Sequence, residues 1–253
     1  MNTCNSDTKI VVKDITKQFP GENPEQGLAL YDVNFTVQTN EFVTIVGRSG
    51  CGKSTMLNIA AGLLSPTKGE VLINGRAVNG PGSDRGMVFQ YSGLFPWLTA
   101  IENIEFGPRN VGMPKAERRA SAQELIELVR LKGFENKYPR ELSGGMQQRV
   151  AIARAMALDP EILLMDEPFG SLDQLTREDM QRELLRVWEI RKKTVLFVTH
   201  SIIEAIYLSD RILVFNPNPG FVKKEFVIEL PRPRQKSYPD FMRYYEEIYE
   251  AIC

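Results

Sequence analysis

The first part of the chain alternates apolar and polar residues over short distances. Residues 10–12 and 30–37 show this alternation, which is typical of strands with one buried face. Residues 42–46 (Phe-Val-Thr-Ile-Val) form a compact apolar run instead, as in a strand buried on both faces. The pattern therefore predicts three short strands before residue 47.

Helical and strand-like patterns then take turns along the chain. A helix is expected from Lys53 to about Leu64, and short buried strands are expected at residues 71–73, 87–89, 162–165 and 194–198. Strands that alternate with helices predict an α/β domain with a mostly parallel sheet. Residues 92–150 look helical and nearly strandless, which indicates an inserted helical subdomain.

The end of the chain has one more helical pattern. After Pro239, four apolar residues fall at helical spacing, namely Phe241, Tyr245, Ile248 and Ile252. This helix is expected to pack on its own domain, with the binding of a partner as the alternative.

Composition narrows the class of protein. The length of 253 residues suits one large domain, and a net charge of -1 offers no basic excess for binding nucleic acid. No apolar run is long enough to cross a bilayer, and residues 1–7 are polar, unlike a secretion signal. Cys4, Cys51 and Cys253 are too few and too scattered for a disulfide framework or a metal site. These features indicate a reduced, cytoplasmic protein.

A glycine-rich segment follows the strand expected at residues 42–46. Residues 47–54 (GRSGCGKS) fit the pattern G-x-x-x-x-G-K-[ST], placed between a buried strand and a helix. Glycines let backbone N–H groups turn toward phosphates, and the helix N-terminus adds positive potential. Lys53 could reach the β- and γ-phosphates, and the Ser54 hydroxyl could ligate Mg²⁺.

This loop is expected to bind ATP through a run of consecutive residues: Gly47, Arg48, Ser49, Gly50, Cys51, Gly52, Lys53, Ser54 and Thr55. Because Cys51 lies inside the loop, thiol alkylation is expected to inhibit the protein and MgATP to protect it.

Two carboxylates end the apolar strand expected at residues 162–165. Successive side chains on a strand point to opposite sides, so Asp166 and Glu167 can do different work. One could hold the Mg²⁺ shell while the other orients an attacking water. A solvated strand end would be the simpler explanation if no phosphate loop lay upstream.

A second phosphate-binding arrangement lies at residues 142–149 (LSGGMQQR). Ser143, Gly144 and Gly145 precede a helix and offer a hydroxyl, backbone N–H groups and the helix dipole. Two such arrangements in one chain suggest two ATP molecules shared between two chains related by two-fold symmetry.

This octapeptide resembles the signature motif of the ABC-transporter ATPases, and the resemblance covers nearly the whole chain. It implies a P-loop (RecA-like) α/β ATPase core with an N-terminal antiparallel β-subdomain and an inserted α-helical subdomain. The expected organisation is a single nucleotide-binding domain over residues 1–253, with the helical subdomain at 92–150 and a C-terminal extension at 221–253.

The resemblance also implies roles for individual residues. Glu167 would be the catalytic base, assisted by His200 at the γ-phosphate, by Gln90 and by Lys53. Mg²⁺ would be held by Ser54, Gln90 and Asp166. The remaining nucleotide contacts would be Phe19 on the adenine, Ser143, Gly144 and Gly145 on the nucleotide of the opposite subunit, and Asp173 in a loop that crosses the dimer. Phe19 could instead be a core residue.

Some segments resemble one branch of the family. Residues 94–103, with 219–220 and 230–234, are similar to the importers of nitrate, sulfonates, taurine and bicarbonate. In the family, the first of these segments receives a short permease helix, so Phe95 and Trp97 are candidate contacts unless they belong to the subdomain core. Ser201 departs from the pattern, because an aspartate often follows the histidine.

The expected protein is an ATPase subunit at the cytoplasmic face of the inner (plasma) membrane. Its partners would be a second ATPase subunit (identical or homologous), transmembrane permease subunits and, indirectly, a substrate-binding protein, but not nucleic acid. One alternative is a soluble ABC-type ATPase that is not linked to transport. Another is a metabolic P-loop kinase, which would have no use for residues 142–149.

Overall fold

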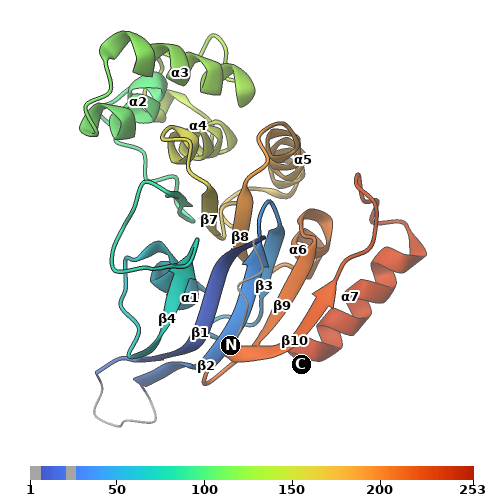
Figure 1. The fold of residues 1–253 in the computed structure, drawn as a ribbon. Helices are drawn as coiled ribbons and strands as arrows, with labels where there is room; N and C mark the ends of the chain where they lie inside the picture. Colours follow the sequence, from blue (N-terminus) through green and yellow to red (C-terminus); the bar gives the residue numbers. More distant parts are fainter. Residues whose placement is uncertain (1–6, 21–26) are drawn as a thin grey trace. The chain divides into compact units, whose positions relative to one another are not determined.

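The computed structural model describes residues 7–20 and 27–253, and Cys4 therefore lies outside the described part (Figure 1). The chain forms two compact units. The first contains the described residues up to Gly82 together with Thr194–Cys253, and the second is Ser83–Lys193. Across the described residues, no helix is long and apolar enough to cross a membrane.

The first unit begins with an antiparallel sheet in the order β2-β1-β4-β5. Its strands are β1 (Thr8–Gln18), β2 (Leu28–Gln38), β4 (Lys68–Ile73) and β5 (Arg76–Ala77). Alternate residues of β1, including Ile10 and Val12, are buried. The expected antiparallel β-subdomain is confirmed.

Parallel strands form the core of the same unit. β3 (Phe42–Val46) pairs in parallel with both β8 (Thr194–Thr199) and β9 (Arg211–Asn216), and β10 (Phe221–Val227) joins β9 antiparallel. Every residue of β3 and β8 is buried. This burial on both faces explains why β3 reads as an apolar run rather than as an alternation.

Helix α1 (Lys53–Ala61) follows β3 and ends about three residues before the expected position. Gly62 caps it in a left-handed conformation with φ 76, and its N–H bonds to the carbonyls of Asn58 and Ile59. A Cβ on Gly62 would lie 2.1 Å from the Gly80 oxygen, so only glycine fits at this point.

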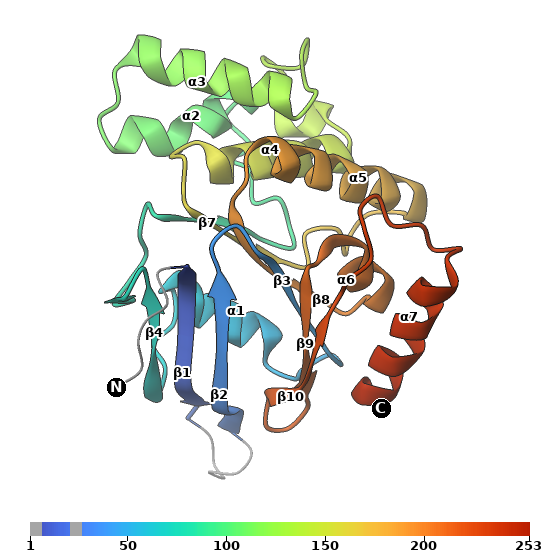
Figure 2. The same ribbon diagram turned by 45° about the vertical axis from the view of Figure 1, so that its right-hand side comes forward.

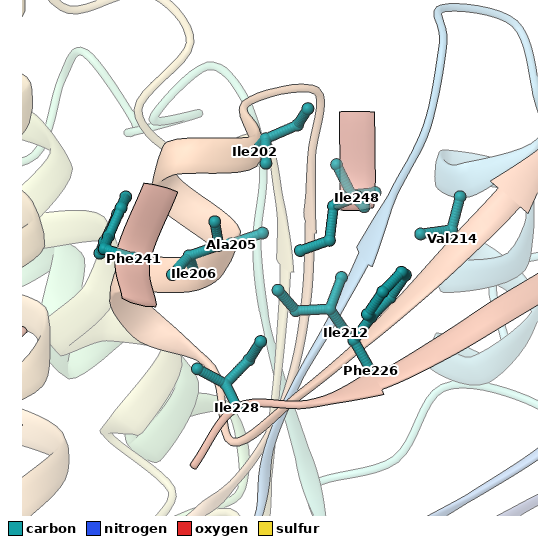
Figure 3. Packing of buried hydrophobic residues seen from close by; sticks show 10 residues of the cluster. Ile202, Ala205, Ile206, Ile212, Val214, Phe226, Ile228, Phe241 and Ile248 are labelled. Atoms are coloured by element: carbon teal, nitrogen blue, oxygen red, sulfur yellow. The ribbon is translucent and has the colours of Figure 1, made fainter. Parts of the chain in front are cut away.

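Two helices complete the first unit: α6 (Ile202–Leu208) and α7 (Pro239–Ile252) (Figure 2). Phe241 and Ile248 of α7 are buried in one cluster with residues of α6, β9 and β10 (Figure 3). Tyr245 and Ile252 pack against that cluster. The expectation that the last helix packs on its own domain is confirmed.

The second unit combines two parallel strands with the remaining helices. β6 (Arg85–Val88) pairs with β7 (Ile162–Asp166). The helices are α2 (Ala100–Asn110), α3 (Lys115–Leu128), the 3₁₀ turn Pro139–Glu141, α4 (Gly144–Met156) and α5 (Gln174–Ile190). Residues 91–156, all of them described, contain no strand, and α4 continues beyond residue 150.

Candidate nucleotide site

The loop between β3 and α1 needs glycine for two reasons. Gly50 and Gly52 have φ values of 81 and 89, which other residues rarely adopt. A Cβ on Gly52 would also lie 2.6 Å from Leu30 Cδ2 and 2.9 Å from the Ala29 oxygen. The loop therefore folds tightly against β2.

Gly220 adds a second support beneath the loop. Its N–H donates to the Ala29 oxygen at 3.0 Å, and its oxygen accepts from the Tyr31 N–H at 2.9 Å. A Cβ on Gly220 would lie 2.1 Å from the Cys51 oxygen. The backbone of β2 and of the turn before β10 thus forms the floor of the loop.

The other side of the loop faces outward and suits a phosphate. Arg48, Ser49, Gly50 and Ser54 are exposed, whereas Lys53 is 5% exposed and its Nζ donates to the carbonyls of Gly47 (2.9 Å) and Arg48 (3.1 Å). No side chain caps the N-terminus of α1, and its first turn contains no acidic residue. A helix start of this kind has N–H groups and positive potential to offer an anion.

Cys51 corrects the expectation about alkylation. Its side chain is fully buried, and its Sγ lies 4.0 Å from Lys53 Nζ. A Cβ on Gly47 would lie 2.8 Å from that sulfur. A buried thiol of this kind is shielded from alkylating reagents whether or not MgATP is bound.

His200 emerges beside the phosphate loop. In the parallel pairing of β3 with β8, Val46 is the register partner of Thr199, so Gly47 and His200 follow paired residues at one edge of the sheet. His200 is exposed there. Ser201, which replaces the usual aspartate, caps α6 by accepting from the Glu204 N–H at 3.3 Å. The departure therefore preserves a capping side chain.

The second unit brings the other catalytic candidates together. Val88 of β6 pairs with Met165 of β7, so Gln90 follows the end of one strand while Asp166 ends the adjacent strand and Glu167 follows it. A Cβ on Gly170 would lie 3.5 Å from Gln90 Nε2 and 3.7 Å from Glu167 Oε2, which places both side chains around this glycine.

Glu167 has an unusual backbone conformation. Its φ of 42 is rare for a residue with a side chain, and its carbonyl accepts from the Gly170 N–H at 3.0 Å. Strained backbone held by its surroundings is concentrated at functional sites. The turn from Glu167 to Gly170 thus fixes the backbone from which the carboxylate extends.

Ser143, Gly144 and Gly145 lie at the start of α4. The Ser143 hydroxyl accepts from the Met146 N–H at 3.3 Å and caps the helix, and Ser143 and Gly144 are exposed. A Cβ on Gly144 would lie 3.3 Å from Leu172 Cδ2, and one on Gly145 would lie 2.8 Å from Thr176 Cγ2. These glycines allow the starts of α4 and α5 to pack closely.

Asp173 caps α5 next to this segment. Its carboxylate accepts from the Thr176 N–H at 3.1 Å, and hydrogen bonds from Thr176 hold the pKa of the Asp173 carboxyl below its usual range. The exposed carboxylate and the exposed start of α4 thus share one surface of the second unit.

Three side chains that sequence reasoning missed hold these loops in place. Arg177 donates to the carbonyls of Phe169 (3.2 Å) and Leu172 (2.7 Å), which braces the segment before Asp173. Arg154 donates to the carbonyls of Ser92 (2.9 Å) and Gly93 (2.8 Å), just after Gln90.

Gln147 is the third, and it links the loop after Gln90 to α4. Its Oε1 accepts from Ser92 Oγ at 3.3 Å, and its Nε2 donates to the Pro139 oxygen at 2.9 Å. Gln147 lies inside the predicted octapeptide, so its polar amide was a signal that could have been used. The sequence around Arg154 contained no such signal, because the partners of Arg154 lie about 60 positions earlier in the chain.

Three aromatic residues whose sequence interpretation was open are now placed. Phe19 is 40% exposed and Lys17 Nζ lies over its ring, so it is not a core residue. Phe95 is half-buried, with its ring centroid 4.3 Å from that of Phe106. Trp97 is 68% exposed and is therefore the more available of the two candidate contacts.

The expected Mg²⁺ ligands fit an ion that arrives with a nucleotide. The described residues contain no cluster of three or more His, Cys, Asp or Glu side chains that could hold a metal by themselves. Mg²⁺ usually keeps several waters and needs only one or two carboxylates beside substrate phosphates. Asp166 of the second unit is one such carboxylate, and the exposed Ser54 of the first unit offers a hydroxyl at the phosphate loop.

A glycine loop between a buried strand and an uncapped helix, in a chain with strand-end carboxylates and an outward-facing histidine, defines a P-loop ATPase. A family model described as "ABC transporter" matches residues 30–170. The chain belongs to this family and, as an ABC transporter ATP-binding protein, hydrolyses ATP.

Curated relatives and a solved structure agree. An uncharacterized ABC transporter ATP-binding protein of Methanocaldococcus jannaschii is 52% identical over 96% of this chain and 91% of its own. The aliphatic sulfonates import ATP-binding protein SsuB of Bacillus licheniformis is 50% identical (84% and 82%), and the nitrate import ATP-binding protein NrtD of Synechocystis is 44% identical (94% and 92%). A dimeric ATP-binding cassette in a post-hydrolysis state, bound to ADP and Pi, matches with TM-score 0.75 at 39% identity (88% and 100%).

Proposed function

We propose that this chain is the ATPase subunit of an importer, in which MgATP-driven closure of two ATPase subunits drives a separate permease. The observation that carries the proposal is the exposed start of α4 beside the exposed Asp173. This second anion-binding surface lies in the unit that does not contain the phosphate loop. A phosphoryl-transferring kinase would have no use for it, whereas a dimer that shares its nucleotides needs one on each subunit.

Each residue has a definite task in this cycle. Lys53 exchanges its two loop carbonyls for oxygens of the β- and γ-phosphates, and Ser143 with Gly144 binds the γ-phosphate held by the partner subunit. Glu167 orients the attacking water for in-line displacement, and His200 holds the γ-phosphate. Mg²⁺, bound through Ser54, Gln90 and Asp166, would neutralise the charge that develops on the phosphates.

The site residues and the Mg²⁺ ligands named here all belong to the proposal. Phe19 is proposed to stack on the adenine, which its exposure permits. The subunit would work at the cytoplasmic face of the inner membrane, with Trp97 and the loop after Gln90 against the permease. The permease would in turn receive cargo from a substrate-binding protein.

We infer a small anion as the cargo. The names of similar proteins include nitrate, aliphatic sulfonates and taurine importers, and all of these substrates carry an anionic oxygen group. Because an ATPase subunit does not touch the cargo, the choice among these anions has to be made in cells.

The test is uptake of labelled nitrate, taurine, alkanesulfonate and bicarbonate in cells that lack this chain. Complementation with the natural chain should restore uptake of one class, and Glu167→Gln should not. In purified complex, Glu167→Gln should lower turnover by about 10²–10⁴-fold while leaving ATP binding intact. Glu189→Gln, an exposed change in α5, is the matched control. Full turnover in Glu167→Gln would contradict the proposed mechanism.

A further inference from the structure

The segment after β10 sends a buried arginine to the end of α6. Arg234 is 4% exposed, and its Nη1 donates to the carbonyls of Ile206 and Ser209 at 2.5 Å each. Its Nη2 donates to the Ile228 oxygen at 3.1 Å and its Nε to the Leu230 oxygen at 2.9 Å. The guanidinium of Arg234 therefore joins the end of α6 to residues 228–230, which lie only a few positions before Arg234 in the sequence.

A second arginine acts at the same place. Arg232 donates to the Leu208 oxygen at 2.6 Å and to Asp210 Oδ1 at 2.5 Å. The last carbonyls of a helix have no partner inside the helix, and cations near them are favourable. Burial lowers the pKa of Arg234 to about 10, so its guanidinium remains protonated at neutral pH. The two arginines thus cap the C-terminal end of α6.

The opposite end of α6 is tied to the residues that flank His200. The Ser201 N–H donates to Thr199 Oγ1 at 3.0 Å, and Thr199 Oγ1 and Glu204 Oε2 lie 2.5 Å apart. Ser201 also caps the helix through the Glu204 N–H. Since Thr199 and Glu204 are buried, the backbone on both sides of His200 is fixed to the first turn of α6.

The buried side of α6 packs next to the start of the phosphate loop. Ile202 and Ile206 belong to a buried cluster (Figure 3). Val46, the residue directly before Gly47, is a member of the same cluster. Phe241 and Ile248 of α7 close the cluster from outside. α6 is therefore held at both ends and along one side.

We propose that Arg234 is a positioning residue for His200: by fixing the end of α6, it keeps the imidazole where it can reach a γ-phosphate. The inference rests on the role of His200 in the proposed function. It assigns a structural role to residues 230–234. The sequence pattern relates this segment only to one branch of the ABC transporter family. Arg234 touches no substrate, so its effect must pass through His200.

The experiment measures ATP and ADP affinity separately, in the Glu167→Gln background, so that little ATP is consumed during the measurement. Arg234→Met should weaken ATP binding by about tenfold and leave ADP binding unchanged, because ADP lacks the phosphate that His200 holds. Arg234→Lys, which keeps the charge with fewer donors, should recover part of the loss. In a His200→Ala background, Arg234→Met should cause no further loss of ATP affinity.

Controls separate this role from a merely structural one. Ile126→Val removes one methylene from the buried side of α3 (Lys115–Leu128) in the second unit, and it should lower the melting temperature while leaving the ATP-to-ADP affinity ratio unchanged. Equal weakening of ATP and ADP by Arg234→Met, or a further loss in the His200→Ala background, would overturn the inference. If Arg234→Met does not fold, the same comparison is made with Arg234→Lys, and an unchanged affinity ratio there overturns it as well.

The outcome for His200→Ala alone distinguishes the two proposals. If that change leaves the ATP-to-ADP affinity ratio as it is, the proposed contact of His200 with the γ-phosphate is wrong. If it lowers the ratio while Arg234→Met does not, the contact stands and only the positioning role of Arg234 fails.

Discussion

Val46 and Thr199 are register partners in the parallel pairing of β3 with β8. Since the residue after each of them leaves the sheet at the same edge, Gly47 and His200 start from neighbouring positions although they are far apart in sequence. A slip of this pairing would move His200 relative to the phosphate loop by a whole residue, about 3.3 Å. The complete burial of both strands resists such a slip.

Close packing of α4 on α5 can be tested at Gly145. In Gly145→Ala the new methyl would lie 2.8 Å from Thr176 Cγ2, and we expect a loss of about 1–3 kcal/mol in the free energy of unfolding. Thr176→Ser removes that methyl and should restore part of the loss in the double variant.

Gly80→Ala is the matched control for this change. A Cβ on Gly80 would meet nothing within 4 Å. Alanine should raise stability there by about 0.4–1 kcal/mol, because it restricts the unfolded chain. Urea unfolding of the variants measures both effects, and equal losses at the two positions would contradict the explanation from packing.

The loop that carries Trp97 depends on one buried amide. Asn103 Oδ1 accepts from the Phe95 N–H at 2.8 Å, and its Nδ2 donates to the carbonyls of Leu98 and Thr99 at 3.0 Å each. Asn103→Ala leaves these groups without that partner and should cost about 3 kcal/mol in urea unfolding.

Trp97→Ala should behave in the opposite way. Because the side chain is 68% exposed, stability should change by less than about 0.5 kcal/mol. Stimulation of ATPase activity by the permease should nevertheless fall, as measured in reconstituted membranes. Tyr31→Ala, at another exposed aromatic, is the control and should leave the stimulation unchanged. Normal stimulation in Trp97→Ala would exclude this residue from the contact.

Thiol labelling distinguishes the sequence interpretation of Cys51 from the structural one. Maleimide should modify the exposed Cys253 quickly, and it should modify Cys51 quickly only after unfolding in urea. MgATP should make no difference to Cys51, as followed by peptide mass spectrometry. Rapid labelling of Cys51 that MgATP blocks would show that the thiol is not buried.

The lowered pKa of the Asp173 carboxyl predicts how the free energy of unfolding depends on pH in acid. Hydrogen bonds lower the folded-state pKa of its carboxyl, so its contribution to stability is present above the unfolded-state value of 3.8 and is lost as pH falls through the folded-state value. Asp173→Asn keeps a capping side chain but cannot titrate. Unfolding at a series of pH values should show the natural chain to be the more stable at neutral pH, with the two stabilities converging below about pH 4 because the variant declines less. An unchanged decline would contradict the assignment.

Local patterns predicted much of this fold. The run at residues 42–46 and the loop pattern at residues 47–54 reinforce each other, and both are found where expected. The helix at the end of the chain was placed correctly because its apolar residues repeat along one face.

What the sequence did not predict depends on residues far away in the chain. The left-handed Gly62 ends α1 after Ala61, and the backbone of Gly80 beside it leaves no room for a side chain there. The position of Cys51 in the loop says nothing about the direction of its side chain, which is set by the packing around Gly47. The catalytic assignments at Gln90 and Glu167 stay predictions, although the second unit places these two side chains around one glycine.

The floor under the phosphate loop has a consequence for synthesis on the ribosome. Cys51 rests on Gly220, and β3 is paired on one side with β8 and on the other with β9, which are made long after the loop itself. A nascent chain that stops before residue 220 has the whole glycine motif but not the backbone that supports it. Nucleotide binding should therefore appear late in translation, and truncated chains should not compete for ATP with the finished subunit.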